Sequence, residues 1–213
     1  MFDLDGTLVD SSRDIAEAVD AAIARVAPGT APLGVEQVRS FVGSGARVLI
    51  ERSLRASGLA ARLEVEGVLA VFMECYAARL TATTRLYPGA AAALDALAHL
   101  PLAVLTNKPG PLSRRLLDEL QIADRFALVV GGGDLATKKP DPAGLLWIAA
   151  QLGRKPERTL IVGDSGIDVR TGRAAGTLTA GLRGGFDPEG VESESPDLLL
   201  DDLSELPVRL SEL

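Results

Sequence analysis

The sequence predicts an α/β fold with a small helical domain inserted after the first strand. From residue 84 onward, short apolar segments alternate with helical segments, a pattern typical of a parallel sheet that is buried on both faces. Between residues 12 and 83, by contrast, the apolar spacing indicates helices and no strand. We therefore expect a Rossmann-like, doubly wound core domain from residues 1–11 and 84–213, with an all-α cap domain from residues 12–83.

The insert is expected to begin with a helix after the polar cluster at residues 10–12. Apolar residues recur at helical spacing from Ile15 to Val26, and the Pro- and Gly-rich stretch at residues 28–32 ends the pattern. Further helices are expected at residues 35–42, 46–57 and 64–80.

The core is expected to alternate helices with short buried strands. Helices are predicted at residues 90–98, 112–120, 143–152 and 169–175, and strands at residues 102–105, 127–130, 159–162, 178–182 and 197–200. Residues 184–195, rich in Gly, Glu and Ser, are expected to form a surface loop. The first strand has only Met1 and Phe2 before Asp3, which is short for a central strand. Either the chain start is misassigned or truncated, or the sheet tolerates a short strand at its middle.

Composition and charge narrow the function classes. Hydrophobic residues make up 47% of the 213 residues, so a packed core is expected. The net charge of −7 argues against binding nucleic acid or an anionic membrane through bulk electrostatics. Cys75 is the single cysteine, so no intrachain disulfide forms; with no secretory or membrane-spanning pattern, we expect a cytoplasmic protein. His99, the single histidine, is expected at the surface, so the mechanism should need no histidine.

Two pairs of carboxylates follow apolar segments that read as strands. Asp3 and Asp5 come directly after the first segment, and Gly6 gives the chain freedom to turn there. Asp164 and Asp168 follow the strand at residues 159–162, spaced so that both can point toward one site. Close carboxylates repel each other unless a cation lies between them, and they suit hard cations such as Mg²⁺. The alternatives are a solvated acidic turn for the first pair and an acidic helix start for the second.

Hydroxyl and amino side chains follow two other strands. Thr106 and Asn107 end the strand at residues 102–105, where they could bind phosphate oxygens or begin a helix. Lys139 precedes Pro140, whose fixed backbone would help to aim the ammonium group; the alternative is a solvated lysine.

In this order, the four signals resemble the motifs of the haloacid dehalogenase-like superfamily, in its phosphatase branch. The first motif is Asp3-Leu-Asp-Gly-Thr-Leu-Val-Asp10, the second ends in Thr106, the third contains Lys139, and the fourth is Gly163-Asp-Ser-x-x-Asp168. This superfamily carries a helical cap directly after the first strand. Asp141 stands where many relatives have His, which places a negative charge near the site.

The resemblance implies a Mg²⁺-dependent phosphomonoester hydrolase. Asp3 would be the nucleophile that forms an aspartyl-phosphate, and Asp5 the general acid and base. Mg²⁺ would bind the carboxylates of Asp3 and Asp164 and the backbone carbonyl of Asp5. Thr106 and Lys139 would hold phosphate oxygens, with Asn107 beside them. Asp168 would orient Lys139 or a metal-bound water.

The expected cap helps to choose the substrate. The segment from Phe41 to Ile50 resembles the cap of bacterial phosphoglycolate phosphatases, so 2-phosphoglycolate is the expected substrate. Gly43, Ser44 and Gly45 would offer N–H donors, and Arg47 would add a cation for a small carboxylate; the alternative for Arg47 is a solvated helix residue. Other small phosphomonoesters (a sugar phosphate, a nucleotide or pyrophosphate) and a sugar-phosphate mutase remain alternatives. We expect a monomer or homodimer that acts on a small molecule.

Overall fold

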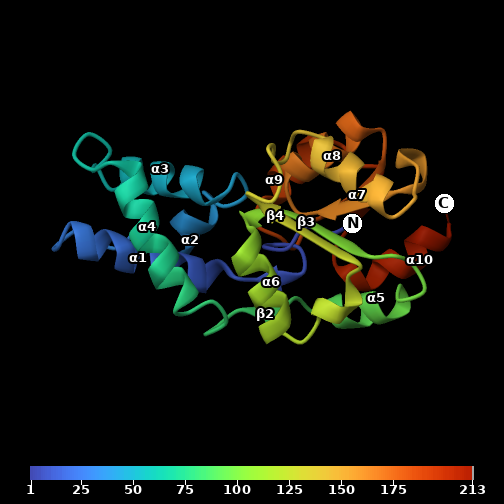
Figure 1. Cartoon of the computed structure of the whole chain (residues 1–213), viewed down its shortest axis with the longest axis horizontal. Helices are drawn as coiled ribbons and strands as arrows, with labels where there is room; N and C mark the ends of the chain where they lie inside the picture. Colours follow the sequence, from blue (N-terminus) through green and yellow to red (C-terminus); the bar gives the residue numbers. More distant parts are fainter. Residues whose placement is uncertain (213) are drawn as a thin grey trace. The chain divides into compact units, whose positions relative to one another are not determined.

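The computed structural model describes residues 1–212 and divides into two compact units (Figure 1). One unit contains Met1–Asp10 and Leu86–Leu213, and the other contains Ser11–Arg85. We call them the core unit and the helical unit. These boundaries lie beside the expected ones, and the separate roles expected for the two domains stay predictions.

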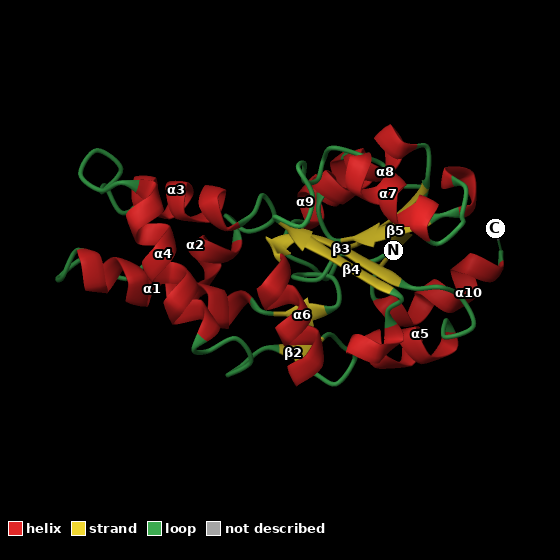
Figure 2. Cartoon of the chain, viewed as in Figure 1, coloured by secondary structure: helices red, strands yellow, loops and turns green. Residues whose placement is uncertain are grey.

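The core unit is built on a parallel sheet, as expected. Its strands are β3 (Ala103–Pro109), β4 (Leu128–Gly132), β5 (Leu160–Gly163), β6 (Leu178–Leu182) and β7 (Leu198–Leu200), shown in yellow where visible in Figure 2. Strand β3 pairs with β4, and β5–β6–β7 form the other half. All of these pairs are parallel, which requires the helical crossovers that the alternating sequence pattern predicts. Strand β1 (Val9–Asp10) pairs with β2 (Arg85–Leu86), and these two short strands lie where the chain enters and leaves the helical unit.

Phe2 joins the two halves of the sheet. It forms parallel bridges to Val104 of β3 and Val162 of β5. On the β3 side the Phe2 amide donates to Ala103 at 2.9 Å, and on the β5 side the Asp3 amide donates to Val162 at 2.9 Å. The expected first strand is therefore reduced to a single pair of bridges. Its position between two longer strands fixes the backbone of Asp3 at the centre of the sheet.

Helices cover both faces of this sheet. Their bounds are α5 (Ala90–Ala96), α6 (Gly110–Glu119), α7 (Ala143–Gln151), α8 (Gly166–Ala175), α9 (Pro188–Ser193) and α10 (Leu206–Ser211), with short 3₁₀ segments at Ala123–Arg125, Pro156–Arg158 and Leu203–Glu205. Figure 1 shows α7, α8 and α9 on one face, and α5, α6 and α10 on the other. Apolar residues of β3, β4 and β5 pack against α7 and α8 in a buried cluster that includes Leu105, Leu145 and Ile161.

The surface loop expected at residues 184–195 is wrong over part of its length, because α9 forms there. Asp187 caps this helix by accepting a hydrogen bond from the Gly190 amide at 3.1 Å, and Pro188 occupies its first turn. Val191 is fully buried, so one apolar side chain anchors a segment whose polar composition suggested a loop.

The helical unit contains α1 (Ser12–Val26), α2 (Val35–Arg39), α3 (Ala46–Ala56) and α4 (Val65–Ala77). These helices form where the apolar spacing predicts them. The buried Asp14 of α1 ties the two ends of the unit together, since its Oδ2 accepts hydrogen bonds from the amides of Thr83 and Thr84 at 2.8 and 2.7 Å. None of the helices within residues 1–212 is both long and apolar enough to span a membrane.

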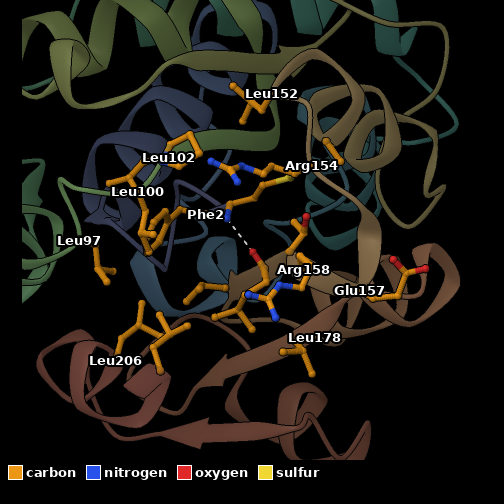
Figure 3. Close-up of a pocket in the computed structure, with 17 residues that line it drawn as sticks. Phe2, Leu97, Leu100, Leu102, Leu152, Arg154, Glu157, Arg158, Leu178 and Leu206 are labelled. Carbon is orange, nitrogen blue, oxygen red and sulfur yellow. Dashed lines mark hydrogen bonds between the residues drawn. The ribbon is translucent and has the colours of Figure 1, made fainter. Parts of the chain in front are cut away.

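A pocket of about 440 Å³ lies at the amino-terminal edge of the core sheet (Figure 3). Its lining is largely apolar and includes Leu102, Leu160 and Leu178, which stand at or next to the starts of β3, β5 and β6. Arg154 and Arg158 also line it. None of the predicted site residues of the core lines this pocket.

Candidate active site

Carboxylates from two distant parts of the chain meet at the carboxyl edge of the core sheet. Asp3 follows the Phe2 bridge and Asp164 follows β5, so parallel pairing brings them to the same edge. One carboxylate oxygen each from Asp3, Asp164 and Asp168 lies within 4.8 Å of the others, and all three residues are buried. The structure therefore brings together three of the acidic residues that the sequence singled out, while the carboxylate of Asp5 is outside this cluster.

Lys139 lies among these carboxylates. Its ammonium Nζ donates to Asp168 Oδ1 at 2.6 Å and lies 2.9 Å from Asp3 Oδ1. The second contact has the distance of an ion pair but not the alignment of a hydrogen bond, so Asp3 Oδ1 has no aligned donor. The amide Nδ2 of Asn107 donates to the backbone carbonyl of Lys139 at 2.9 Å. Asn107 thus helps to hold the lysine backbone in place.

Asp168 is fully engaged by neighbouring donors. Its Oδ2 accepts hydrogen bonds from the Ser165 hydroxyl at 2.7 Å and the Ser165 amide at 3.2 Å, which form a capping box at the start of α8. Its Oδ1 accepts the bond from Lys139. Asp168 therefore belongs to the capping box of α8 and also accepts a hydrogen bond from the lysine, and its role in orienting that lysine stays a prediction.

Asp164 occupies a close-fitting cradle. Its Oδ1 accepts a hydrogen bond from the Thr7 hydroxyl and its Oδ2 one from the Phe186 amide, both at 2.7 Å. A Cβ atom added to Gly6 would lie 2.1 Å from Asp164 Oδ2, and one added to Gly185 would lie 2.0 Å from Asp164 Cβ. Gly6 also has a φ of +87°, in the region that favours glycine. Glycine at both positions leaves the room that the carboxylate needs.

Asp5 has a partner that sequence reasoning missed. The ammonium of Lys108 lies 2.9 and 3.1 Å from the two carboxylate oxygens of Asp5, and the Lys108 side chain is 2% exposed. Lys108 belongs to β3, two residues after Thr106. The backbone amide of Lys108 donates to the Thr106 hydroxyl at 3.2 Å, within the part of β3 where the pairing with β4 is irregular, between Leu105 and Pro109. The sequence signal for this residue is the run Thr106-Asn107-Lys108, in which the pattern predicts only Thr106 and Asn107 as site residues.

Burial and mutual repulsion set the protonation behaviour of the carboxylates. Burial raises the pKa of Asp3 to about 6, with Lys139 lowering it and Asp168 raising it. Burial, followed by repulsion from Asp3 and Asp168, raises the pKa of Asp164 to about 8. Burial opposes the charged form of Lys139, but attraction to Asp168 and Asp3 outweighs it and raises the lysine pKa above its ordinary value.

The donor set fits a divalent cation. Three buried carboxylates face one ammonium, which leaves two negative charges to be balanced when all are ionised. Asp3 Oδ1 has no aligned donor, and the two oxygens of Asp164 accept hydrogen bonds from neutral donors, whereas Asp168 accepts one from the ammonium of Lys139. Asp3 and Asp164 are therefore the better ligands, and oxygen donors of this kind suit Mg²⁺. The carboxylate of Asp5 faces Lys108, which agrees with a metal contribution from its backbone carbonyl alone.

Asp141, which departs from the resembling motif, has a structural role. Its Oδ1 accepts a hydrogen bond from the Ala143 amide at 2.8 Å, at the start of α7, and the residue is exposed.

The remaining predicted residues belong to the helical unit. Gly45 directly precedes α3 with a φ of +91°, and Arg47 lies in the first turn of that helix. The Arg47 guanidinium donates to Glu66 Oε1 at 2.7 Å and also pairs with Glu51, while half of its side chain is exposed. Arg47 thus already has two anionic partners within its own unit. Substrate binding by Gly43, Ser44, Gly45 and Arg47 stays a prediction.

A family model, curated relatives and a solved structure all match this chain over most of its length. The family model of the haloacid dehalogenase-like hydrolases matches residues 1–176. Phosphoglycolate phosphatase 1 of Pseudomonas aeruginosa is 42% identical, over 97% of this chain and 77% of that protein. The phosphoglycolate phosphatase of Photorhabdus laumondii is 38% identical, over 96% of this chain and 88% of that protein. The crystal structure of a "predicted phosphoglycolate phosphatase" from Haemophilus somnus superposes with a TM-score of 0.91 at 30% identity, covering 99% of this chain and 96% of that one.

Proposed function

Because this chain belongs to the haloacid dehalogenase-like hydrolase family, we propose that it is a Mg²⁺-dependent phosphatase that hydrolyses 2-phosphoglycolate to glycolate and phosphate. The observation that carries this proposal is the buried cluster of Asp3, Asp164 and Lys139 at the carboxyl edge of the sheet. Phosphoryl transfer needs charge neutralisation and alignment, and this cluster supplies both. The names of the relatives from Pseudomonas aeruginosa and Photorhabdus laumondii support the choice of substrate.

The chemistry proceeds in two steps. A carboxylate oxygen of Asp3 attacks phosphorus, the bond between phosphorus and the ester oxygen breaks, and Asp5 gives a proton to the leaving alkoxide. Asp5 then takes a proton from a water molecule, which attacks the phosphorus of the aspartyl-phosphate and restores the Asp3 carboxylate. Asp5 lies two residues from Asp3 on the same turn, so one short segment provides both the nucleophile and the acid.

The other residues bind and align the phosphoryl group. Lys139, held by Asp168 and by the Asn107 amide, donates to one phosphoryl oxygen, and the Thr106 hydroxyl binds another. Asp3 and Asp164 would hold the Mg²⁺ ion together with the carbonyl of Asp5. When bound, the ion neutralises charge on the phosphoryl oxygens.

The physiological setting follows from the substrate and the composition. We propose a cytoplasmic enzyme that works as a monomer or homodimer on a small soluble anion. A single buried cysteine is in keeping with a reducing compartment. Light scattering of the purified protein tests the assembly state, and a larger oligomer would contradict it.

A substrate panel tests the proposed function. The purified protein is assayed for phosphate release from 2-phosphoglycolate, glucose 6-phosphate, β-glucose 1-phosphate, a nucleoside monophosphate and pyrophosphate, with Mg²⁺ and with chelator. We expect the highest kcat/KM for 2-phosphoglycolate, loss of activity with chelator, and no activity from the Asp3→Asn variant. A low rank for 2-phosphoglycolate would overturn the substrate assignment, and conversion of β-glucose 1-phosphate to glucose 6-phosphate would indicate a mutase instead.

A further inference from the structure

Lys108, which forms a buried ion pair with the proposed acid Asp5, has no role in the steps described above. Lys108 and Asp5 face each other with side chains that are 2% and 9% exposed. Lys139 and Thr106 already serve the phosphoryl group, and Lys139 already balances Asp3 and Asp168. The ammonium of Lys108 is thus a second buried cation at the same sheet edge, directed at the acid rather than at the nucleophile.

The position of Asp5 defines what lies near this second cation. Under the proposed function, Asp5 donates to the leaving oxygen, so that oxygen lies at hydrogen-bond distance from the Asp5 carboxylate. Lys108 Nζ is 2.9 and 3.1 Å from the two oxygens of that carboxylate. The ammonium therefore borders the space that the leaving group enters. In 2-phosphoglycolate a single methylene separates the ester oxygen from the carboxylate, so the substrate carboxylate lies in that space.

We propose that Lys108 is a specificity-determining residue that binds the carboxylate of the leaving group. This inference rests on the proposed function and names the residue behind its substrate choice. When one carboxylate oxygen of Asp5 hydrogen-bonds to the leaving oxygen, its ion pair with the Lys108 ammonium weakens. A buried cation whose charge is only partly balanced costs free energy. A substrate carboxylate replaces the missing acceptor. An uncharged leaving group of the same size does not.

The alternative cation for this task is less suitable. Arg47 of the helical unit is half exposed and is paired with both Glu51 and Glu66. A substrate carboxylate would have to compete with two resident carboxylates and with water, so an exposed pair of this kind contributes little discrimination. Lys108 is buried, and its ammonium is paired with the carboxylate of Asp5 itself. It is therefore the stronger source of selectivity.

The experiment compares two esters that differ only at the recognised group. Specificity constants (kcat/KM) are measured for 2-phosphoglycolate and for 2-hydroxyethyl phosphate, in which a hydroxymethyl group replaces the carboxylate. The proteins are the wild type, Lys108→Gln, Lys108→Met and the control Lys155→Gln, which makes the same change at an exposed lysine. The ratio of the two constants is taken within one preparation, so it does not depend on the fraction of folded enzyme.

We expect the wild type and Lys155→Gln to prefer 2-phosphoglycolate strongly, and both Lys108 variants to lower the ratio by about 30-fold, as for the loss of one charge-assisted hydrogen bond. An equal loss on both esters, with the ratio unchanged, would show that Lys108 only positions Asp5 and would overturn the inference alone. A wild type that turns over both esters equally would overturn it as well, while leaving the phosphatase activity intact. A wild type inactive on both esters would overturn the inference and the proposed function together.

Discussion

The two edges of the core sheet are formed by the same strands but hold opposite kinds of residues. At the carboxyl edge, the ionisable residues Asp3, Asp164 and Lys139 are buried. At the amino edge, leucines surround a pocket in which Phe2 is one of the lining residues (Figure 3). Phe2 and Asp3 are adjacent in sequence, so the change from apolar to charged occurs within one residue at the centre of the sheet. The amino edge contributes apolar burial, whereas the carboxyl edge holds charge that the fold must tolerate.

This difference predicts which substitutions should change the stability of the fold and which should change the turnover of the enzyme. Buried carboxylates with raised pKa values destabilise the folded chain when they ionise, and such groups persist where a ligand or a reaction needs them. Removal of a carboxylate at the carboxyl edge should therefore lower turnover while leaving stability unchanged or higher. Changes at the amino edge should alter stability alone.

The largest effect is expected for Asp3→Asn. The variant loses the nucleophile, so turnover of 2-phosphoglycolate should fall at least about a thousandfold. Because the amide removes one of three mutually repelling carboxylates, the metal-free variant should melt above the wild type at pH 8. Phosphate release and thermal melts measure the two quantities. Equal melting temperatures, or substantial residual turnover, would contradict the division between the edges.

Lys139→Met should affect both turnover and stability. The change leaves Asp3 and Asp168 without their ammonium partner, which is expected to cost about 3–5 kcal/mol in the free energy of unfolding at neutral pH. Urea denaturation measures this cost, with Lys155→Met as the exposed control. Since Lys139 also binds the phosphoryl group, kcat should fall by about a hundredfold or more in the fraction that remains folded. A fully stable variant would show that the lysine is not the counter-ion of the carboxylates.

Gly185→Ala tests the cradle of Asp164 without removing a charge. The new methyl group would collide with the Asp164 side chain and displace it, so the Mg²⁺ concentration for half-maximal activity should rise about tenfold. Gly184→Ala is the matched control, because a Cβ atom there would meet only the Asp201 carbonyl at 3.4 Å. An unchanged Mg²⁺ requirement in the Gly185 variant would argue against Asp164 as a ligand.

The pH dependence of stability gives a smaller but diagnostic effect. Asp3 and Asp164 have folded pKa values of about 6 and about 8, above the ordinary 3.8, so the folded state binds their protons more tightly than the unfolded state does. The stability that these two groups contribute is complete below about pH 4 and is lost as the pH rises through about 6 and about 8. Melts of the metal-free wild type minus those of Asp164→Asn should show the part of this decline that Asp164 causes, and Mg²⁺ at pH 8 should restore the wild type. A difference that is flat with pH would contradict the buried charges.

Leu102→Ala at the amino edge should leave kcat unchanged. Leu102 is buried, so its truncation is expected to cost about 2 kcal/mol in unfolding free energy. Urea denaturation and the phosphatase assay make the comparison. A clear loss of kcat in the folded variant would mean that the two edges are coupled.

The sequence was sufficient to predict that the two pairs of carboxylates would supply one cluster. Asp3 and Asp164 each follow an apolar segment, and parallel strands end at the same edge, so their meeting follows from the pattern. The pairing of Lys108 with Asp5 could not be predicted in this way, because it depends on β3 lying beside the Phe2 bridge. In the sequence, Lys108 looks like any lysine before a helix.

The loop between β6 and β7 shows a second limit. Its Gly, Glu and Ser content suggested irregular structure, although Asp187 and Pro188 are typical of a helix start. The Phe186 amide from this segment holds Asp164, a contact across 22 residues that no local pattern encodes. Composition describes the average of a segment, whereas the site depends on single groups within it.

Direct detection of the phosphorylated nucleophile tests the central claim. The wild type and Asp5→Ala are mixed with p-nitrophenyl phosphate, whose leaving group needs little acid assistance, quenched in acid and digested for mass spectrometry. We predict a phosphoryl group on Asp3, at higher occupancy in Asp5→Ala because the base for hydrolysis is missing, and none in Asp3→Asn. Turnover without any phosphorylated Asp3, or a phosphoryl group on another residue, would contradict the account.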